Sequence, residues 1–444
     1  MSAMDLRNSV GARLIIVGVL TFLLLIPSIM IRSLISERKE RRDSVADDIS
    51  HNWGARQILI GPVLNIPFKY RVYDDHKNIV DLIKYAHFLP GRLDIDGVID
   101  PEVRNRGIYD AVVYKCSLDV SAVFGTPQFD EMKIDKGNIL FEDASISFGI
   151  SDMKGVRDPI LFDWQGNRNI EADPGVPSND LFTSGISVPV KITPDTSEYS
   201  FRTNLKLNGS FGLFFSPIGK ETNVRLASNW PNPSFTGDYL PIDRQLGRDG
   251  FVAEWSVPHV SRGFPQKWLE SRYDLNESLF GVSLLLSVDQ YQKTMRTVKY
   301  AIMFIALTFL TFFIIDILSG QPIHPIQYLL IGLALMVFYT LLLSLSEYIA
   351  FRYAYLIASV AIVAMITFYS TSFLPGKIRS LIVAIVLIVL YGYLYIVLQL
   401  QDYALLMGSL ILFLALALVM YLTRKLEWFK VLNYSKTDNR DSAR

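Results

Sequence analysis

The C-terminal third of the chain contains a long segment that is almost free of charge. Between Tyr300 and Thr423 only six residues are Asp, Glu, Lys or Arg, whereas the whole chain of 444 residues carries 43 basic and 43 acidic side chains. One helical crossing of a hydrocarbon core about 30 Å thick takes about 20 mostly apolar residues. Because backbone groups in lipid must bond within their own segment, such crossings are helices. The segment therefore predicts a bundle of membrane-spanning helices.

Three breaks help to divide residues 299–423 into five predicted spans. Pro and Gly occur in residues 319–325, Pro-Gly and two cations in residues 374–380, and a short polar turn in residues 399–403. A separate apolar run, residues 14–35, has no A-x-A cleavage site and precedes a charged stretch, so it predicts an uncleaved signal anchor that bends at Pro27. The six predicted spans cover residues 14–35, 300–317, 326–346, 353–373, 378–398 and 403–422.

Six spans place both chain termini on one side of the membrane. Lys377 and Arg379 lie in one tight loop on that side, and residues 1–13 and 424–444 add further cations. Short loops rich in Lys and Arg face the cytoplasm. The cations of residues 37–42 would face outward, where a long translocated domain is less bound by this rule. The sequence therefore predicts a multi-pass protein with both termini, residues 1–13 and 424–444, in the cytoplasm.

Residues 36–298 predict one mainly-β extracytoplasmic domain, inserted between the first and second spans. The charged residues 36–54 contain no Pro and predict an initial helix that ends at Gly54. After it, short runs alternate apolar and polar residues, as around Leu205 and Leu207, between Gly, Asn and Pro. The Pro-rich residues 229–241 are typical of an ordered loop rather than a strand. Within them we expect an interaction loop formed by Trp230, Pro231, Pro233 and Phe235.

The motifs of common catalytic and cofactor sites are missing from the sequence. It has no GxGxxG, no GxSxG, no HExxH and no P-loop, and its five His residues are scattered. The acidic residues 94–100 fall short of an EF-hand and are typical of a strand edge followed by a turn. The single Cys116 excludes an intramolecular disulfide and is expected to be a buried, apolar-like side chain. We predict no catalytic residue, no cofactor and no metal, and the balanced charge argues against nucleic acid as a partner.

Polar residues in or near the predicted spans are the better functional candidates, because charge inside a membrane is costly. They are Asp316, His324, Glu347 and Arg352. We expect Asp316 to be a solvated helix end, and Glu347 and Arg352 either to pair with each other or to reach the lipid headgroups. Tyrosines of the last spans, among them Tyr355 and Tyr391, are expected mainly as interfacial anchors.

Several long stretches resemble the CreD family of cell envelope integrity, or colicin tolerance, proteins. They are RGIYDAVVY (106–114), SNWPNPSFTGDYLP (228–241), GFVAEWSVPHVSRGFPQ (250–266), DQYQKTMRTVKYAIMFI (289–305), HPIQYLLIGLALMVFYTLLLSLSE (324–347) and QDYALLMGSLILF (401–413). The resemblance implies a bacterial inner-membrane protein with a large periplasmic domain, associated in some bacteria with a two-component system that responds to stress. It implies no established enzymatic activity. The chain departs from the family pattern at Asp316, where Glu is expected, and at Tyr348, where His is expected.

Three functions are compatible with these features. The first is a non-enzymatic protein that supports envelope integrity and the stress response, anchored in the lipid bilayer, with a periplasmic domain that binds a periplasmic protein or an envelope polymer. The second is a transporter or lipid-handling protein that uses the C-terminal spans, motivated by Asp316, Glu347 and the turn that contains His324. The third is a hydrolase of envelope polymers, supported only by abundant acidic residues. We favour the first.

Overall fold

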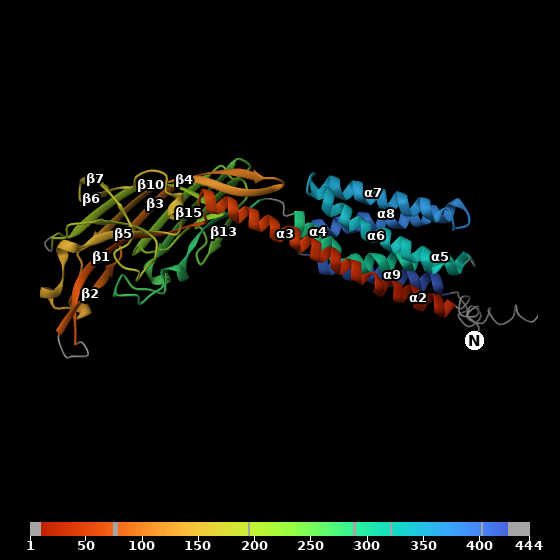
Figure 1. Ribbon diagram of the computed structural model, residues 1–444, viewed down its shortest axis with the longest axis horizontal. Helices are drawn as coiled ribbons and strands as arrows, with labels where there is room; N and C mark the ends of the chain where they lie inside the picture. Colours follow the sequence, from red (N-terminus) through yellow and green to blue (C-terminus); the bar gives the residue numbers. More distant parts are fainter. Residues whose placement is uncertain are drawn as a thin grey trace, which may run out of the picture. The chain divides into compact units, whose positions relative to one another are not determined.

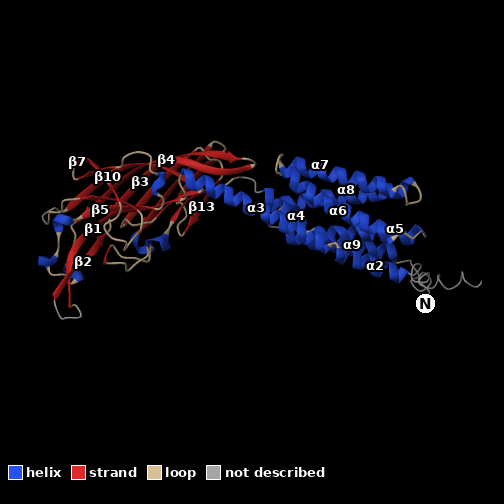
Figure 2. Cartoon of the chain, viewed as in Figure 1, coloured by secondary structure: helices blue, strands red, loops and turns tan. Residues whose placement is uncertain are grey.

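The computed structural model describes residues 10–73, 79–193, 196–286, 290–319, 322–400 and 403–424 (Figure 1). The chain forms two compact units, residues 1–41 with 288–444 and residues 42–287. Helices build the first unit and two sheets build most of the second (Figure 2). The predicted cytoplasmic segments, residues 1–13 and 424–444, lie mostly outside the described residues.

The helical unit contains eight helices in the part of the chain that the structure describes. They are α2 (Val10–Leu23), α3 (Leu25–Trp53, of which residues 42–53 belong to the second unit), α4 (Gln290–Lys299), α5 (Ala301–Ser319), α6 (Pro325–Ser346), α7 (Phe351–Ser370), α8 (Lys377–Gln399) and α9 (Ala404–Thr423). Between α2 and α3 the helical hydrogen bonds continue, because the Leu24 amide donates to Leu20 and the Ser28 amide donates to Leu24. Pro27 has no amide hydrogen for the carbonyl of Leu23, which accounts for the local irregularity.

Four described helices are long and apolar enough to cross a membrane: residues 11–53, Pro325–Ser346, Phe351–Ser370 and Lys377–Gln399. The number rises to five if α4 and α5, which are bent by 45° at Tyr300, form one span. The described apolar stretch of α9, Leu406–Tyr421, is shorter than these. Four or five of the six predicted spans are thus supported, and six stays a prediction.

Aromatic side chains fill the contact between α5, α6, α7 and α8. The ring of Phe338 lies 4.7 Å from that of Tyr391 and 5.5 Å from that of Tyr355. The Tyr355 hydroxyl donates to the Tyr391 carbonyl at 2.7 Å. Tyr355 and Tyr391 are therefore buried between helices, and the expectation that they are interfacial anchors is wrong for both. Sequence spacing could not show this, because the contacts that bury the two side chains come from other helices, as the acceptor of the Tyr355 hydroxyl does.

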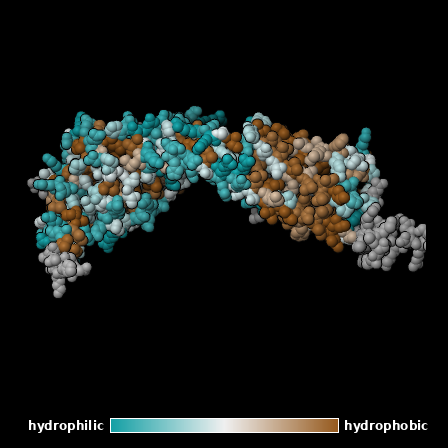
Figure 3. Space-filling view, in the orientation of Figure 1, coloured by the Kyte–Doolittle hydropathy of each residue, from teal (hydrophilic) through white to brown (hydrophobic). Residues whose placement is uncertain are grey.

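The visible surface of the helical unit is largely apolar (Figure 3). Leu, Ile, Val and Phe side chains point outward along α7, α8 and α9, as Phe368, Ile388 and Leu414 do. An apolar surface of this extent suits lipid rather than water.

The second unit contains a nine-stranded sheet, sheet A, and an eight-stranded sheet, sheet B. Sheet A comprises β1 (Gln57–Tyr73), β2 (Ile79–Phe88), β5 (Ser145–Ile150), β8 (Asp173–Pro174), β9 (Gly185–Pro189), β11 (Gly212–Phe215), β13 (Pro233–Gly237), β16 (Lys267–Leu269) and β17 (Phe280–Leu284). Sheet B comprises β3 (Arg92–Arg106), β4 (Tyr109–Gly125), β6 (Leu161–Trp164), β7 (Asn167–Glu171), β10 (Glu198–Ser210), β12 (Glu221–Ser228), β14 (Asp243–Gly247) and β15 (Gly250–Pro258). One-turn 3₁₀ helices occur at Asp130–Met132, Lys136–Asn138, Phe141–Asp143, Met153–Gly155, His259–Ser261 and Leu275–Ser278.

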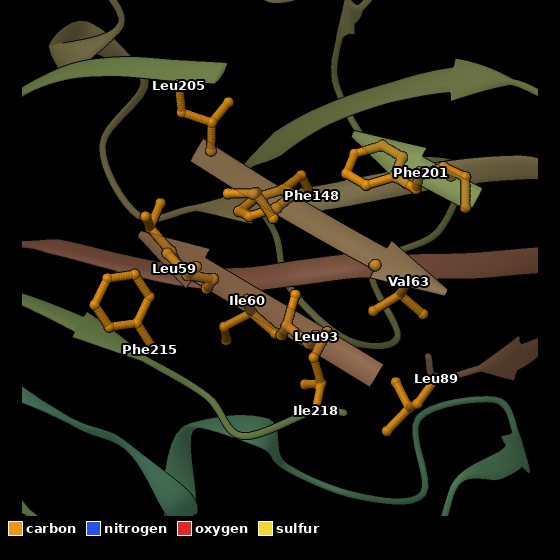
Figure 4. Close-up of a cluster of buried hydrophobic side chains, with 14 of the residues drawn as sticks. Leu59, Ile60, Val63, Leu89, Leu93, Phe148, Phe201, Leu205, Phe215 and Ile218 are labelled. Carbon is orange, nitrogen blue, oxygen red and sulfur yellow. The ribbon is translucent and has the colours of Figure 1, made fainter. Parts of the chain in front are cut away.

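The two sheets share one hydrophobic core. Sheet A runs β13-β17-β11-β1-β5-β9-β8, with β2 paired to β1 and β16 paired to β2, and sheet B runs β14-β15-β12-β3-β4-β10-β6-β7. The pairings are antiparallel except β1–β11 and β3–β12. Side chains from both sheets meet in one core, where Val63 and Phe148 of sheet A lie near Phe201 and Leu205 of sheet B (Figure 4). The two sheets therefore pack as a sandwich.

The alternation seen in the sequence follows this core. In β10, Leu205 and Leu207 are buried while Lys206 between them is exposed. Because side chains on a strand alternate between faces, one face joins the core and the other carries polar groups. The mainly-β fold predicted for this region is confirmed.

The end of α3 is attached to sheet B by Trp53. Its indole nitrogen donates to the Tyr114 carbonyl at 3.1 Å, and the Arg104 guanidinium lies 3.6 Å from its ring centre. Gly54 follows with φ of +137°, and a Cβ there would lie 2.7 Å from the Asn208 carbonyl oxygen. Glycine is required at this helix end by both the backbone conformation and the close approach.

Candidate functional site

The outer face of sheet B forms a polar groove with a volume of about 940 Å³. Strands β12, β3, β4 and β10 form its floor, the chain from Asp158 into β7 forms one side, and Ile242 before β14 lies on the other. Its charged side chains are Asp94, Asp96, Asp119, Asp158, Asp163, Glu254, Arg202, Lys206 and Arg225. A hollow of this size is in the range of small-molecule and peptide sites, although its lining is more polar than most.

Strand register places five polar side chains in one row across the groove floor. Glu254, Arg225, Asp96, Asp119 and Asn204 are direct neighbours on β15, β12, β3, β4 and β10. Arg225 lies 3.4 Å from both Asp96 and Glu254. Asn204 donates to Asp119 at 2.6 Å. We call these five residues the polar row.

The polar groove is acidic overall. Six of its lining side chains are carboxylates and three are cations. Asp96 stands directly opposite Asp119, which is unfavourable for two like charges on neighbouring strands. Among the described residues, the lining includes no His or Cys, and no group of three His, Cys, Asp or Glu side chains is placed to hold a metal ion. The groove thus offers hydrogen-bond acceptors and negative charge to a ligand.

Of the residues 94–100, Asp94, Ile95 and Asp96 line this groove, and the segment is not a strand edge followed by a turn. Strand β3 continues through Asp100 to Arg106, and β3 is a central strand of sheet B. Asp94 accepts from Arg92 at 2.7 Å. The expectation of a turn is wrong, because the hairpin partner β4 pairs with β3 along its whole length.

The predicted interaction loop is partly a strand. Pro233 begins β13, the edge strand of sheet A, and Phe235 pairs with Val282 of β17. Proline is tolerated at the start of an edge strand, so the expectation that residues 233–237 form a loop is wrong. Trp230 and Phe235 are half-buried, and the Trp230 indole donates to the Leu285 carbonyl. Pro231 is exposed.

Phe235 packs against the main core of the second unit. Its ring lies 5.6 Å from that of Phe251 and 5.7 Å from that of Trp255, both edge to face. These contacts give Phe235 a packing role that is sufficient to explain an aromatic residue at this position.

Asp316 is buried within the helical unit and is 1% exposed. Its two carboxylate oxygens lie 2.9 and 2.8 Å from Nη1 of Arg13 on α2, and one of them accepts from the Ile323 amide at 3.2 Å. The expectation of a solvated helix end is wrong, because Arg13 of α2, which directly precedes the first predicted span, neutralises the carboxylate. Nothing local signals this pairing, since the two residues are 303 positions apart.

His324 caps the next helix. Its Nδ1 accepts from the Ile326 amide at 3.3 Å, and the side chain of Gln327 accepts from the His324 amide at 2.9 Å. This reciprocal arrangement is a capping box followed by Pro325 in the first turn of α6. The side chain of His324 thus has a structural task at the start of α6.

Glu347 and Arg352 do not pair with each other. Glu347 accepts from the Tyr291 hydroxyl at 3.1 Å and lies 4.0 Å from Arg38 of α3. Arg352 is exposed, donates to the Tyr353 hydroxyl at 2.9 Å and lies over the Tyr353 ring. Both partners of Glu347 come from helices that no local sequence pattern places beside it.

His87 and Cys116 are buried titratable groups of the second unit, and only the burial of Cys116 was expected from the sequence. His87 is 1% exposed, with Nδ1 2.8 Å from the Asn65 side-chain oxygen and Nε2 3.3 Å from Asp180. Burial lowers the pKa of His87, and the neighbouring Asp180 carboxylate offsets part of this effect. Cys116 is buried as expected, and burial raises the pKa of its thiol to about 12.

Comparison with known proteins identifies the family. Residues 9–429 match the family model described as "Inner membrane protein CreD". The chain is 34% identical over 415 residues to the inner membrane protein CreD of Escherichia coli (strain K12), covering 92% of this chain and 91% of that protein. Together with the apolar helices, this match makes the protein a multi-pass protein of the inner membrane. The chain therefore belongs to the CreD family of inner membrane proteins.

Proposed function

We propose that this protein supports cell envelope integrity and the response to envelope stress without catalysing a reaction. Its helical unit anchors it in the inner membrane. Its second unit, residues 42–287, which we call the β unit, binds an envelope component or a periplasmic protein through the polar groove. The observation that carries this proposal is the groove itself, an open, acidic hollow on a rigid sheet face. Sites built on packed strands hold their groups in place better than sites on loops.

The charge of the groove narrows the chemistry of the partner. Carboxylates outnumber cations two to one along its lining. A ligand that brings ammonium or guanidinium groups, or many hydrogen-bond donors, complements this surface. The guanidinium of Arg202 makes no hydrogen bond or ion pair with the described residues, so its donors are free for an acidic or carbonyl group of the ligand.

The bundle fits an anchor better than a transport path. Asp316 and Glu347, the acidic residues that motivated the transport alternative, already have partners within the helical unit. Aromatic side chains occupy the space between α6, α7 and α8. A bundle that only anchors the protein needs its buried carboxylates paired with neighbouring side chains, as these two are.

Site-specific photocrosslinking in native membranes tests the proposal. A photoreactive residue at Asn204, in the groove, is expected to capture a discrete envelope component or protein. The same residue at exposed Glu171 of β7, outside the groove lining, serves as the control and is expected to capture nothing specific. Substituting Asp96→Asn and Asp119→Asn together should weaken capture, because these changes remove two negative charges from the polar row. Equal capture at both positions, or no capture at Asn204 under envelope stress, would contradict the proposal.

A further inference from the structure

A second hollow lies on the helical unit, between α7 and α8. It has a volume of about 870 Å³, and we call it the apolar groove. Leu356, Val360 and Phe368 of α7 and Ile388 of α8 form much of its wall. All four side chains are at least half exposed on the outer surface of the unit, so the groove opens toward the lipid.

Glycine helps to make this hollow. Gly392 of α8 lines the groove, and a Cβ built there would have no atom within 4 Å. A larger residue would therefore occupy empty space in the groove without displacing the helix. Behind it, the Tyr355 hydroxyl donates to the Tyr391 backbone carbonyl at 2.7 Å, so this hydroxyl is satisfied within the bundle.

The groove ends at a cation. Arg352 lines it at the start of α7, and Thr371 lines it just beyond the last residue of α7. A helix of 20 residues is about 30 Å long, which equals the thickness of the hydrocarbon core. Because Arg352 is the second residue of α7, its guanidinium lies at the level of the lipid headgroups.

Arg352 has no anionic partner in the described part of the chain. Its guanidinium is held 4.5 Å from the Tyr353 ring centre and donates to the Tyr353 hydroxyl. Glu347, the nearest acidic residue in sequence, is engaged by Tyr291 instead. The cation is thus oriented by an aromatic ring and still has donors free for an anion.

We propose that the apolar groove binds one phospholipid, with an acyl chain along α7 and α8 and the phosphate at Arg352. Arginine matches phosphate geometry and binds it through paired hydrogen bonds. A hydrocarbon chain in the groove makes van der Waals contacts along the apolar wall, and these contacts stabilise the bound lipid. A second copy could also cover the wall with one of its outward-facing apolar helices, α7, α8 or α9, but these contain no Asp or Glu and would bring no anion to Arg352, so the charge favours the lipid. This site is separate from the polar groove and does not depend on the function proposed for it.

Lipid binding by the purified full-length protein tests the site. The detergent-solubilised protein is titrated with phosphatidylglycerol, and native mass spectrometry counts the bound lipids. Two variants test the two parts of the site separately. Arg352→Gln removes the charge at the phosphate contact, and Gly392→Leu fills the hollow for the acyl chain. Matched controls are Arg379→Gln, a cation at the start of α8 outside the groove, and Val389→Leu, an exposed position of α8 outside the groove.

The wild-type protein is expected to retain one phosphatidylglycerol that 10 mM inorganic phosphate does not displace. Each groove variant should bind it about tenfold more weakly. Arg352→Gln loses one charged hydrogen-bonded contact to the phosphate, and Gly392→Leu loses the space for the acyl chain. Both controls should bind as the wild type does. Unchanged binding in both groove variants, an equal loss in the controls, or displacement by inorganic phosphate would overturn the proposal. Recovery of a protein dimer through the groove in place of lipid would do so as well.

Discussion

The ion pair between Arg13 and Asp316 offers a sharp test of how the first span is held in the bundle. Asp316 is 1% exposed and the Arg13 side chain is 19% exposed, so water screens the pair poorly. Asp316 accepts from Arg13 through both oxygens and from the Ile323 amide. Replacing Asp316 with Leu removes all three contacts and leaves a guanidinium that cannot lose its charge.

Breaking a buried pair from one side costs about 3–5 kcal/mol. We expect Asp316→Leu to lower the free energy of unfolding of the helical unit by about this amount. Arg13→Leu should cost less, because an unpaired carboxylate can take up a proton. The double variant should be close to the wild type, since it leaves neither charge unpaired.

Equilibrium unfolding in mixed micelles of a mild detergent and SDS, followed by circular dichroism, measures these differences. A double-mutant cycle then gives the coupling between the two residues, whose magnitude should be at least about 3–5 kcal/mol, because a double variant close to the wild type regains the whole cost of Asp316→Leu. A cost below about 1 kcal/mol for Asp316→Leu, or single losses that simply add in the double variant, would contradict a stabilising pair between Arg13 and Asp316.

Three further predictions concern the β unit. Because burial raises the pKa of Cys116 to about 12, maleimide should label the native thiol at least about a hundredfold more slowly than the unfolded chain, and fast native labelling would contradict its burial. Because the pKa of His87 is lowered in the folded state, the unfolded chain takes up a proton more readily, so stability present above pH about 6.5 should fall as the pH drops below it. Thermal unfolding at pH 7.5 and 5.5 should show this loss in the wild type and in the control variant His51→Gln, whose side chain is exposed, but less of it in His87→Gln. An equal loss in all three proteins would contradict the role of His87. Gly250 has φ of +135° and a Cβ there would overlap the Ser228 carbonyl oxygen, so Gly250→Ala should cost about 2 kcal/mol or more in denaturant unfolding followed by tryptophan fluorescence, and a neutral result would contradict this turn geometry.

Local pattern was enough to predict the class of each region. Alternation around Leu205 and Leu207 indicated a strand with one buried face, and β10 has that face. The long apolar runs indicated spanning helices, and four of them are long enough by themselves. These features depend on the periodicity of neighbouring residues, which the sequence contains directly.

Partnerships between distant residues were beyond the sequence. Arg13 meets Asp316, and Tyr291 meets Glu347, only because separate helices pack together. The polar row depends on the register of five strands, and a shift of one residue on any strand would turn its side chain into the core. The prediction of a loop at Pro233 was wrong because proline occurs both in loops and at the start of edge strands, and the local sequence does not distinguish the two.

A periplasmic partner can bind only if the polar groove faces the periplasm, and labelling of a single cysteine measures this directly. Asn204→Cys in a Cys116→Ser background is treated with a membrane-impermeant maleimide, in intact spheroplasts and in inverted inner-membrane vesicles. We expect rapid labelling in spheroplasts and protection in inverted vesicles, because an envelope partner must reach the groove from the periplasm. Labelling only in inverted vesicles would contradict it, since the groove would then face the cytoplasm.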